Sequence, residues 1–171
     1  LTGDFGPDAP ADEALQQLIQ VGASAGGARA KALVAYNPDT NQIRSGQFDA
    51  PEGFTHWLVK LDGASVGRDR GAVITEGIDY GRIEYAYYLM ATEAGIEMAE
   101  SRLIPEGNRA HFITRRFDRP AGDERLHLLS LCGLDHASYK LSGAYSYEQL
   151  LLLVLDRLSL GRQAAAEIFR R

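Results

Sequence analysis

The sequence predicts an α+β fold in which an antiparallel sheet with one helix among its strands precedes a purely helical region. Strand-like segments separated by turn signals occur at 31–36, 42–48, 55–61, 97–104 and 109–117. The segment at 55–61 is rich in the aromatic and β-branched residues that are typical of strands. Residues 82–94 repeat apolar side chains at helical spacing, and helical patterns alone follow residue 146. This order of elements is typical of a sheet layer followed by a helical region.

The run at 55–61 alternates in the manner of a half-buried strand. Trp57, Val59 and Leu61 share one face, and Lys60 points to the other. The simplest interpretation of a lone strand lysine is a solvated side chain. A functional role for Lys60 therefore needs support from other residues.

Three further segments have distinct local signals. Residues 62–80 contain four glycines and mixed charges, which predicts a loop. The helix at 82–94 ends before Gly95, a typical C′ residue, and its apolar stripe consists of Ile83, Ala86, Tyr87, Met90, Ala91 and Ala94. Ser146 and Gln149 have the spacing of a capping box at the start of an apolar helix.

The composition is that of an ordinary globular protein, with 171 residues, 45% hydrophobic residues and a net charge of −5. An acidic chain lacks the electrostatic footprint of a nucleic-acid-binding protein. The single cysteine, Cys132, excludes an internal disulfide, and we interpret it as a small core residue. The longest apolar run, 150–155, is too short to span a bilayer. A single cysteine is compatible with a reducing compartment, and we expect a cytoplasmic protein. Because the chain starts at Leu1 and ends at Arg171 within a helical pattern, we expect a fragment.

A glycine-rich loop at 22–31 precedes the first predicted strand and carries Ser24 at its tip. Glycine permits positive φ and close backbone approach, and successive N–H groups in such a loop form an anion-binding concavity. Arg29 and Lys31 add positive charge beside it. The loop is therefore interpreted as a cover for phosphate groups. The alternative is a turn of small residues with two solvated cations.

Two other interpretations of this loop fail. A Walker loop requires lysine where Ala28 stands. The segment Gly22-Ala23-Ser24-Ala25-Gly26 matches a nucleophile elbow literally, but the elbow runs from strand to helix. Here the loop leads from a helical pattern into a strand, so a serine hydrolase is disfavoured.

The glycine loop, Lys60 and Glu84 follow one another in the order used by protein kinases. In those enzymes the loop covers the nucleotide phosphates, a strand lysine contacts phosphate oxygens, and a helix glutamate holds the lysine in place. Glu84 lies near the start of the predicted helix, where a carboxylate can also be a simple favourable charge. The same residue could instead reach inward to a cation.

Five segments, in their order along the chain, resemble the HipA family, which comprises bacterial serine/threonine kinases of toxin–antitoxin modules. They are residues 24–31, 58–60, 83–85, 116–119 and 125–147, the last of which resembles the family's stretch leading into the large lobe. The resemblance implies a kinase-like, nucleotide-binding N-lobe over 1–119. It also implies a connector and the first helices of a C-lobe over 120–171.

The resemblance also implies roles for individual residues. Lys60 would contact the ATP phosphates, with Glu84 as its catalytic partner. Ser24 would be the autophosphorylated regulatory serine. The remaining ATP-binding positions would be the loop glycines and the hinge that holds adenine, namely Gly22, Gly26, Gly27, Thr114, Arg115, Arg116 and Phe117.

The chain departs from the family at Arg115, where some members carry glutamate. The catalytic aspartate, its neighbouring asparagine and the Mg²⁺ ligands are expected beyond this chain, so the fragment alone is expected to be inactive. The implied partners are ATP, a protein substrate and a DNA-binding antitoxin, with no direct contact to nucleic acid or membrane. The alternative is a non-catalytic kinase-lobe module that regulates a partner protein. A downstream reading frame encoding Asp-x-His-x-Lys-Asn would favour the kinase.

Overall fold

The computed structural model describes residues 29–47, 49–66, 72–74, 79–120, 124–136, 138, 141, 143 and 145–171. These residues form two compact units. The sheet unit contains the described residues up to Leu89 together with Ala99–Leu126. The helical unit contains Met90–Met98 and His127–Arg171.

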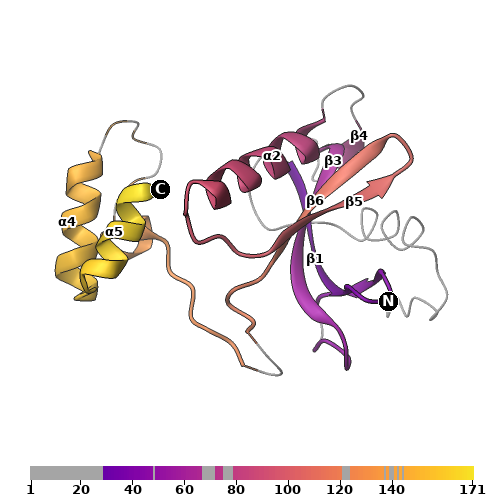
Figure 1. Cartoon of the computed structure of the whole chain (residues 1–171), viewed down its shortest axis with the longest axis horizontal. Coiled ribbons are helices and arrows are strands. Elements are labelled where there is room, and N and C mark those ends of the chain that lie inside the picture. Colours follow the sequence, from indigo (N-terminus) through magenta and orange to yellow (C-terminus); the bar gives the residue numbers. More distant parts are fainter. Residues whose placement is uncertain are drawn as a thin grey trace. The chain divides into compact units, whose positions relative to one another are not determined.

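An antiparallel sheet of six strands builds the sheet unit (Figure 1). The strands are β1 (Arg29–Asn37), β2 (Gln42–Ser45), β3 (Thr55–Val66), β4 (Ala72–Ile74), β5 (Ser101–Glu106) and β6 (Arg109–Arg115). Five of them follow the spatial order β2-β1-β3-β6-β5, and β4 pairs with the end of β3. Helix α2 (Tyr80–Glu93) lies between β4 and β5 in the chain, and the other described helices follow β6. The predicted α+β class is confirmed.

One face of the sheet carries the hydrophobic core. Val59 of β3 lies opposite Ala32 of β1 and Ile113 of β6, so the register aligns their side chains on this face. The predicted alternation holds, because Trp57, Val59 and Leu61 are all buried. We call this side the core face, and the side that carries Lys60 the lysine face.

The predicted loop over 62–80 is wrong for part of its length. Strand β3 continues to Val66 and pairs with β4 in an antiparallel hairpin, with Ser65 opposite Val73. The segment 62–66 is Asp-Gly-Ala-Ser-Val, which lacks an apolar alternation. Its strand conformation depends on pairing with β4, a contact between distant residues that local sequence signals do not contain.

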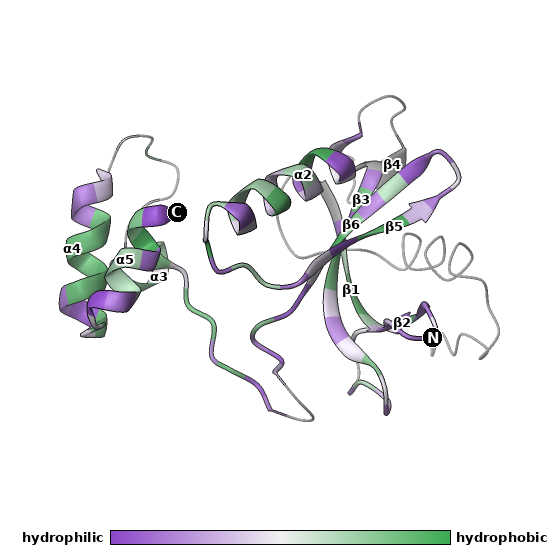
Figure 2. Cartoon of the chain, in the orientation of Figure 1, coloured by the Kyte–Doolittle hydropathy of each residue, from purple (hydrophilic) through white to green (hydrophobic). Residues whose placement is uncertain are grey.

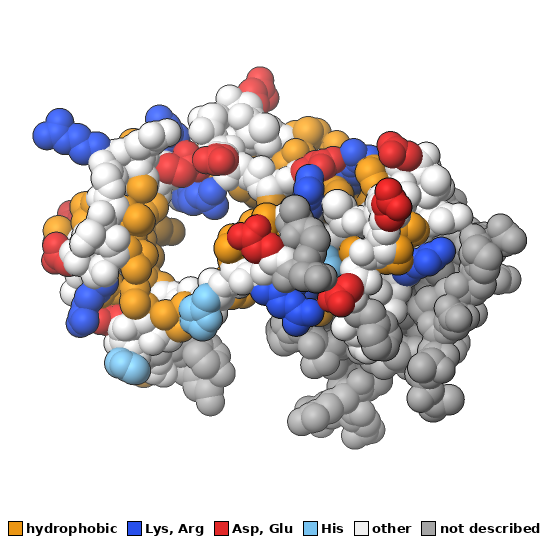
Figure 3. Space-filling view, turned by 90° about the horizontal axis from the view of Figure 1, so that it is seen from below, with side chains coloured by type: hydrophobic (Ala, Val, Ile, Leu, Met, Phe, Trp, Pro, Cys, Tyr) orange, Lys and Arg blue, Asp and Glu red, His pale blue; other side chains and the backbone are white. Residues whose placement is uncertain are grey.

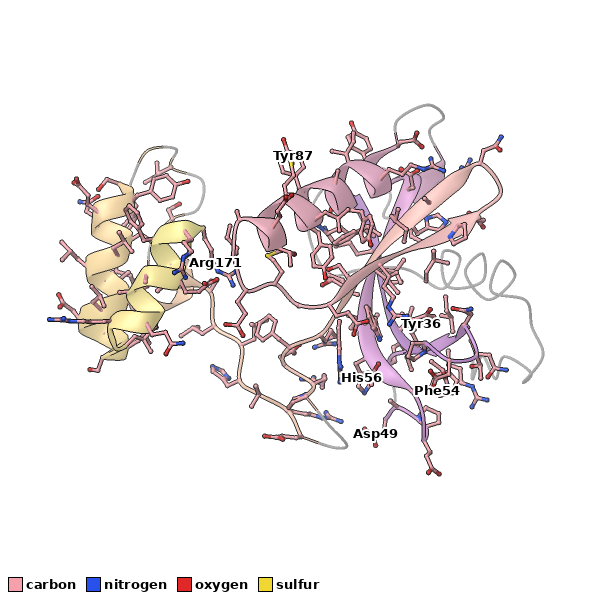
Figure 4. The ribbon with its side chains drawn as sticks, in the orientation of Figure 1. Tyr36, Asp49, Phe54, His56, Tyr87 and Arg171 are labelled. Atoms are coloured by element: carbon pink, nitrogen blue, oxygen red, sulfur yellow. The ribbon has the colours of Figure 1, made fainter. Side chains whose placement is uncertain are left out.

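Helix α2 confirms the predicted helix, but it begins at Tyr80, and Gly95 after it has a φ of +78°. An apolar stripe ordinarily faces a core. Here Ile83, Tyr87 and Met90 of the stripe are exposed, Tyr87 by 66%, and Tyr87 points away from the sheet (Figure 4). The side of α2 nearest the sheet instead contains Gly81, Glu84, Tyr85 and Tyr88, all buried or half-buried.

The helical unit contains α3 (Leu131–Leu134), α4 (Tyr147–Leu158) and α5 (Arg162–Arg170). The capping box at the start of α4 is confirmed, because Ser146 Oγ accepts from the Gln149 N–H at 3.2 Å and Gln149 Oε1 accepts from the Ser146 N–H at 2.8 Å. Hydrophobic residues run along α4 (Figure 2). Cys132 is half-buried rather than a core residue, because α3 is a single short turn.

Hydrophobic side chains also gather on one side of the helical unit (Figure 3). Its exposed apolar residues include Leu128, Leu129, Leu141, Leu152 and Phe169. Among the described residues, every helix is too short or too polar to cross a membrane.

Candidate functional site

Lys60 and Glu84 form an ion pair on the lysine face of the sheet. Strand β3 supplies the lysine, and the second turn of α2 supplies the glutamate, whose Oε2 accepts a hydrogen bond from Lys60 Nζ. The two side chains remain 32% and 25% exposed, respectively. The structure therefore brings together two residues separated by 24 positions, and it leaves both accessible to a ligand.

Aromatic and cationic groups flank this pair. Lys60 lies directly opposite Lys31 of β1 and Phe112 of β6, so these side chains share the lysine face. Lys60 Nζ is 5.5 Å from the centroid of the Phe112 ring, a distance suitable for a cation–π interaction. The result is a half-buried surface with two ammonium groups from neighbouring strands and one carboxylate.

A buried polar chain lies next to the ion pair. The backbone N–H of Asp62 donates to His111 Nδ1 at 2.9 Å, and His111 Nε2 is 2.8 Å from Glu106 Oε2. Since Nδ1 accepts a hydrogen bond, the proton of the neutral ring lies on Nε2 and is donated to Glu106. The Asp62 carboxylate in turn accepts from the Tyr80 N–H at 3.0 Å, at the start of α2.

The backbone N–H groups at the end of β6 are bonded to the strands or segments on both sides of it. The N–H of Arg115 donates to Glu100 O at 2.8 Å, and that of Arg116 donates to His56 O at 2.9 Å. Within the part of the chain that the structure describes, the Phe117 N–H has no partner. The Phe117 ring is 65% exposed.

The predicted hinge residues divide between the two faces of the sheet. Thr114 lies opposite Leu58 and therefore shares the lysine face, and its Oγ1 accepts from Ser101 Oγ at 3.1 Å. Arg115 lies opposite Trp57, on the core face. The Arg115 side chain is consequently directed away from Lys60, and its backbone N–H is already bonded to Glu100 O.

Asp118 closes the turn after β6. Its carboxylate accepts from Arg116 Nε at 3.0 Å and Nη2 at 2.5 Å, and from Arg119 Nη1 at 3.0 Å. The hydrogen bonds from Arg116 lower the pKa of Asp118 despite its burial. Burial, together with the charges of Arg116 and Arg119, lowers the pKa of His56. The ion pair between Arg116 and Asp118 thus fixes the backbone on both sides of Phe117.

We expect Asp118→Asn to destabilise the protein by about 2 kcal/mol at pH 7, because it weakens hydrogen bonds to charged groups. The folded-state pKa of Asp118 lies below its unfolded value, so its contribution is complete above about pH 4 and disappears as the pH falls through the folded pKa. Urea unfolding at pH 7 and pH 3 should show the difference from wild type shrinking at the lower pH. The matched control is Asp49→Asn, which alters an exposed pair with Arg125 and should change stability by less than about 0.5 kcal/mol. An Asp118→Asn effect independent of pH would contradict the assignment.

The glycine-loop positions Gly22, Ser24, Gly26 and Gly27 lie outside the described residues. The chain enters the described part at Arg29, which pairs with Ser65 of β3. A register shift separates Arg29 from Lys31, where the pairing with Lys60 begins. The pairing of β1 with β3 is therefore irregular between Arg29 and Lys31 and becomes regular where Lys31 lies opposite Lys60.

Comparison with known protein families identifies the chain. The family model for the HipA-like C-terminal domain matches residues 23–171. The chain belongs to this HipA family. A search of curated proteins found no match to it. In this HipA-like domain, the matched region begins within the glycine loop and includes both units.

Asp62, His111 and Glu106 were missed by the sequence analysis. Asp62 lies two residues after Lys60, so a strand that continued beyond 61 would have placed both on one face. Because the sequence analysis assigned 62–80 to a loop, it did not place Asp62 on the same face of β3 as Lys60. His111 and Glu106 meet across the β5–β6 hairpin and have no recognisable spacing in the sequence. Among the described residues, no group of three His, Cys, Asp or Glu side chains could hold a metal ion.

Proposed function

We propose that this HipA-like domain is the ATP-binding part of a serine/threonine protein kinase. The observation that carries the proposal is the ion pair between Lys60 and Glu84 on the lysine face. A carboxylate held by a helix fixes the ammonium group of a flexible lysine, and a fixed ammonium can contact phosphate oxygens in a defined geometry. In this role Lys60 binds the phosphates, and Glu84 orients Lys60.

The neighbouring cation supports a phosphate site. Lys31 and Lys60 lie directly opposite each other, so two ammonium groups share the lysine face. Charge-assisted hydrogen bonds from both could reach the oxygens of one phosphate chain. We assign Lys31 as a second contact to the phosphates, and the glycines at 22, 26 and 27 as the cover over them.

Adenine binds at the end of β6 in this proposal. The N–H groups of Arg115 and Arg116 already donate within the sheet unit, so the Phe117 N–H is the donor for a ring nitrogen of the base. The exposed Phe117 ring supplies an apolar surface beside it. The Asp118 carboxylate fixes this turn through Arg116.

Regulation and partners follow from HipA kinases as a class. We propose that Ser24 is autophosphorylated and that this modification inactivates the kinase. A phosphate on Ser24 adds nearly two negative charges, which would repel the loop from the ATP phosphates that it covers. ATP would enter with Mg²⁺, for which the described residues offer no ligand set, and we assign none. A protein is the proposed phosphate acceptor, and a DNA-binding antitoxin is the proposed regulatory partner.

We expect Lys60→Met to weaken ATP binding by about tenfold, the size of one lost contact to a charged group. Isothermal titration of the chain with ATP and with adenosine measures the effect, and adenosine affinity should be unchanged because it lacks phosphates. Arg157→Met, which removes one positive charge from an exposed position of α4, is the control. Absence of ATP binding by the wild-type chain, or equal loss for ATP and adenosine, would refute the proposed role of Lys60.

A further inference from the structure

Strand β3 contacts α2 at two points with matched spacing. On the strand, Lys60 and Asp62 are two residues apart and face the same side, a separation of about 6.6 Å. On the helix, Tyr80 and Glu84 are four residues apart, a rise of about 6 Å. Lys60 binds Glu84 through side chains, and Asp62 Oδ1 accepts from the Tyr80 N–H at 3.0 Å. The first two turns of α2 are therefore each tied to β3 by one contact.

Asp62 is suited to fix the start of α2. The residue is only 5% exposed, and a carboxylate at a helix N-terminus interacts favourably with the unpaired N–H groups and the helix dipole. Its own backbone is bound to His111, which is 1% exposed and bound in turn to Glu106. The carboxylate consequently extends from a backbone that β3, β5 and β6 hold together.

Two further contacts hold the first turn of α2 against β6. A Cβ on Gly81 would lie 1.8 Å from Ala110 O, so glycine permits an approach that no other residue allows. Arg82 donates to Asn108 O from both terminal nitrogens at 3.3 Å. These contacts restrict the distance of α2 from the sheet, whereas the bond to Asp62 restricts its position along β3.

We propose that Asp62 is a positioning residue that sets α2 along β3 so that Glu84 meets Lys60. The proposal rests on the proposed ATP site, because its functional consequence is the orientation of Lys60 towards phosphate. Without the Asp62 carboxylate, α2 can shift along the strand, and Glu84 no longer holds the ammonium group in one place. Adenine recognition at the far end of β6 does not depend on this contact.

The first test compares Asp62→Ala and Asp62→Asn in titrations with ATP and with adenosine. We expect Asp62→Ala to weaken ATP binding about fivefold, the size of one lost helix-terminal hydrogen bond, and to leave adenosine binding unchanged. Asp62→Asn keeps Oδ1 as an acceptor and should restore most of the ATP affinity. Asp62→Ala combined with Glu84→Gln should bind ATP no more weakly than Glu84→Gln alone. Equal losses for ATP and adenosine, or additive losses in the double variant, would overturn the proposal.

The second test needs no nucleotide and separates the positioning role from the proposed function. Amide hydrogen exchange of the ligand-free chain should show faster exchange over Tyr80–Glu93 in Asp62→Ala than in wild type, with Asp62→Asn close to wild type. If exchange shows this pattern but the wild-type chain binds no ATP, the positioning role of Asp62 is supported and the kinase proposal is refuted. Unchanged exchange in Asp62→Ala would overturn the positioning role even if ATP binds.

Discussion

Replacing Trp57 with alanine will lower the free energy of unfolding of the sheet unit by about 3 to 5 kcal/mol. Trp57 is 1% exposed and is the largest fully buried side chain among the described residues. Its ring packs edge-on against Tyr36 with centroids 5.5 Å apart, and its Nε1 donates to Thr55 Oγ1 at 2.8 Å. Truncation removes these contacts and leaves a cavity that the neighbouring strands cannot fill without breaking their register.

Urea unfolding followed by circular dichroism measures this loss. Tyr87→Ala is the matched control, because it also truncates an aromatic side chain, but one that is 66% exposed on α2. The control should change stability by less than about 0.5 kcal/mol. Similar losses in the two variants would mean that Trp57 does not form the centre of the core.

Gly81→Ala is expected to cost about 3 kcal/mol and to separate α2 from the sheet. The added methyl group would lie 1.8 Å from Ala110 O and 2.9 Å from Ala110 C, both backbone atoms of β6 that cannot rotate away. Either β6 or the first turn of α2 must move. Since alanine favours helices more than glycine does, a loss of stability here can only come from the steric conflict.

Thermal unfolding and ATP titration together test the Gly81 prediction. Gly161→Ala, at the N-cap of α5, makes the same change where an added Cβ meets nothing within 4 Å. The control should keep wild-type ATP affinity. In Gly81→Ala we expect ATP affinity to fall with stability, because Glu84 lies one turn along the displaced helix. A stabilised Gly81→Ala variant would refute the close approach described for the first turn.

Local patterns predicted the elements whose signals lie within the element itself. The alternation at 55–61 identified the buried side of β3, and the spacing of Ser146 and Gln149 identified the start of α4. The pairing of Lys60 with Glu84 could be anticipated because their order along the chain resembles that of kinases. The catalytic and ATP-binding roles assigned to these and the hinge residues stay predictions.

Features that depend on contacts between distant residues were not predictable. The extension of β3 to Val66 depends on β4, which forms only as its partner. The apolar stripe of α2 was visible in the sequence, but the helix turns Glu84 towards the sheet because Lys60 and Asp62 provide polar contacts there. The ion pair, the helix-terminal hydrogen bond and the close approach at Gly81 together hold this side of α2 against the sheet.

The register between β3 and its neighbouring strands determines both which side chains form the core and which face of the sheet carries Lys60. Successive strand residues face opposite sides, so a slip of one residue exchanges the two faces. Such a slip would bury the charge of Lys60 and expose Val59, which is fully buried here. A chain with this misaligned register would therefore lose its core and would not fold. The packing that buries Val59 therefore also keeps Lys60 on the lysine face.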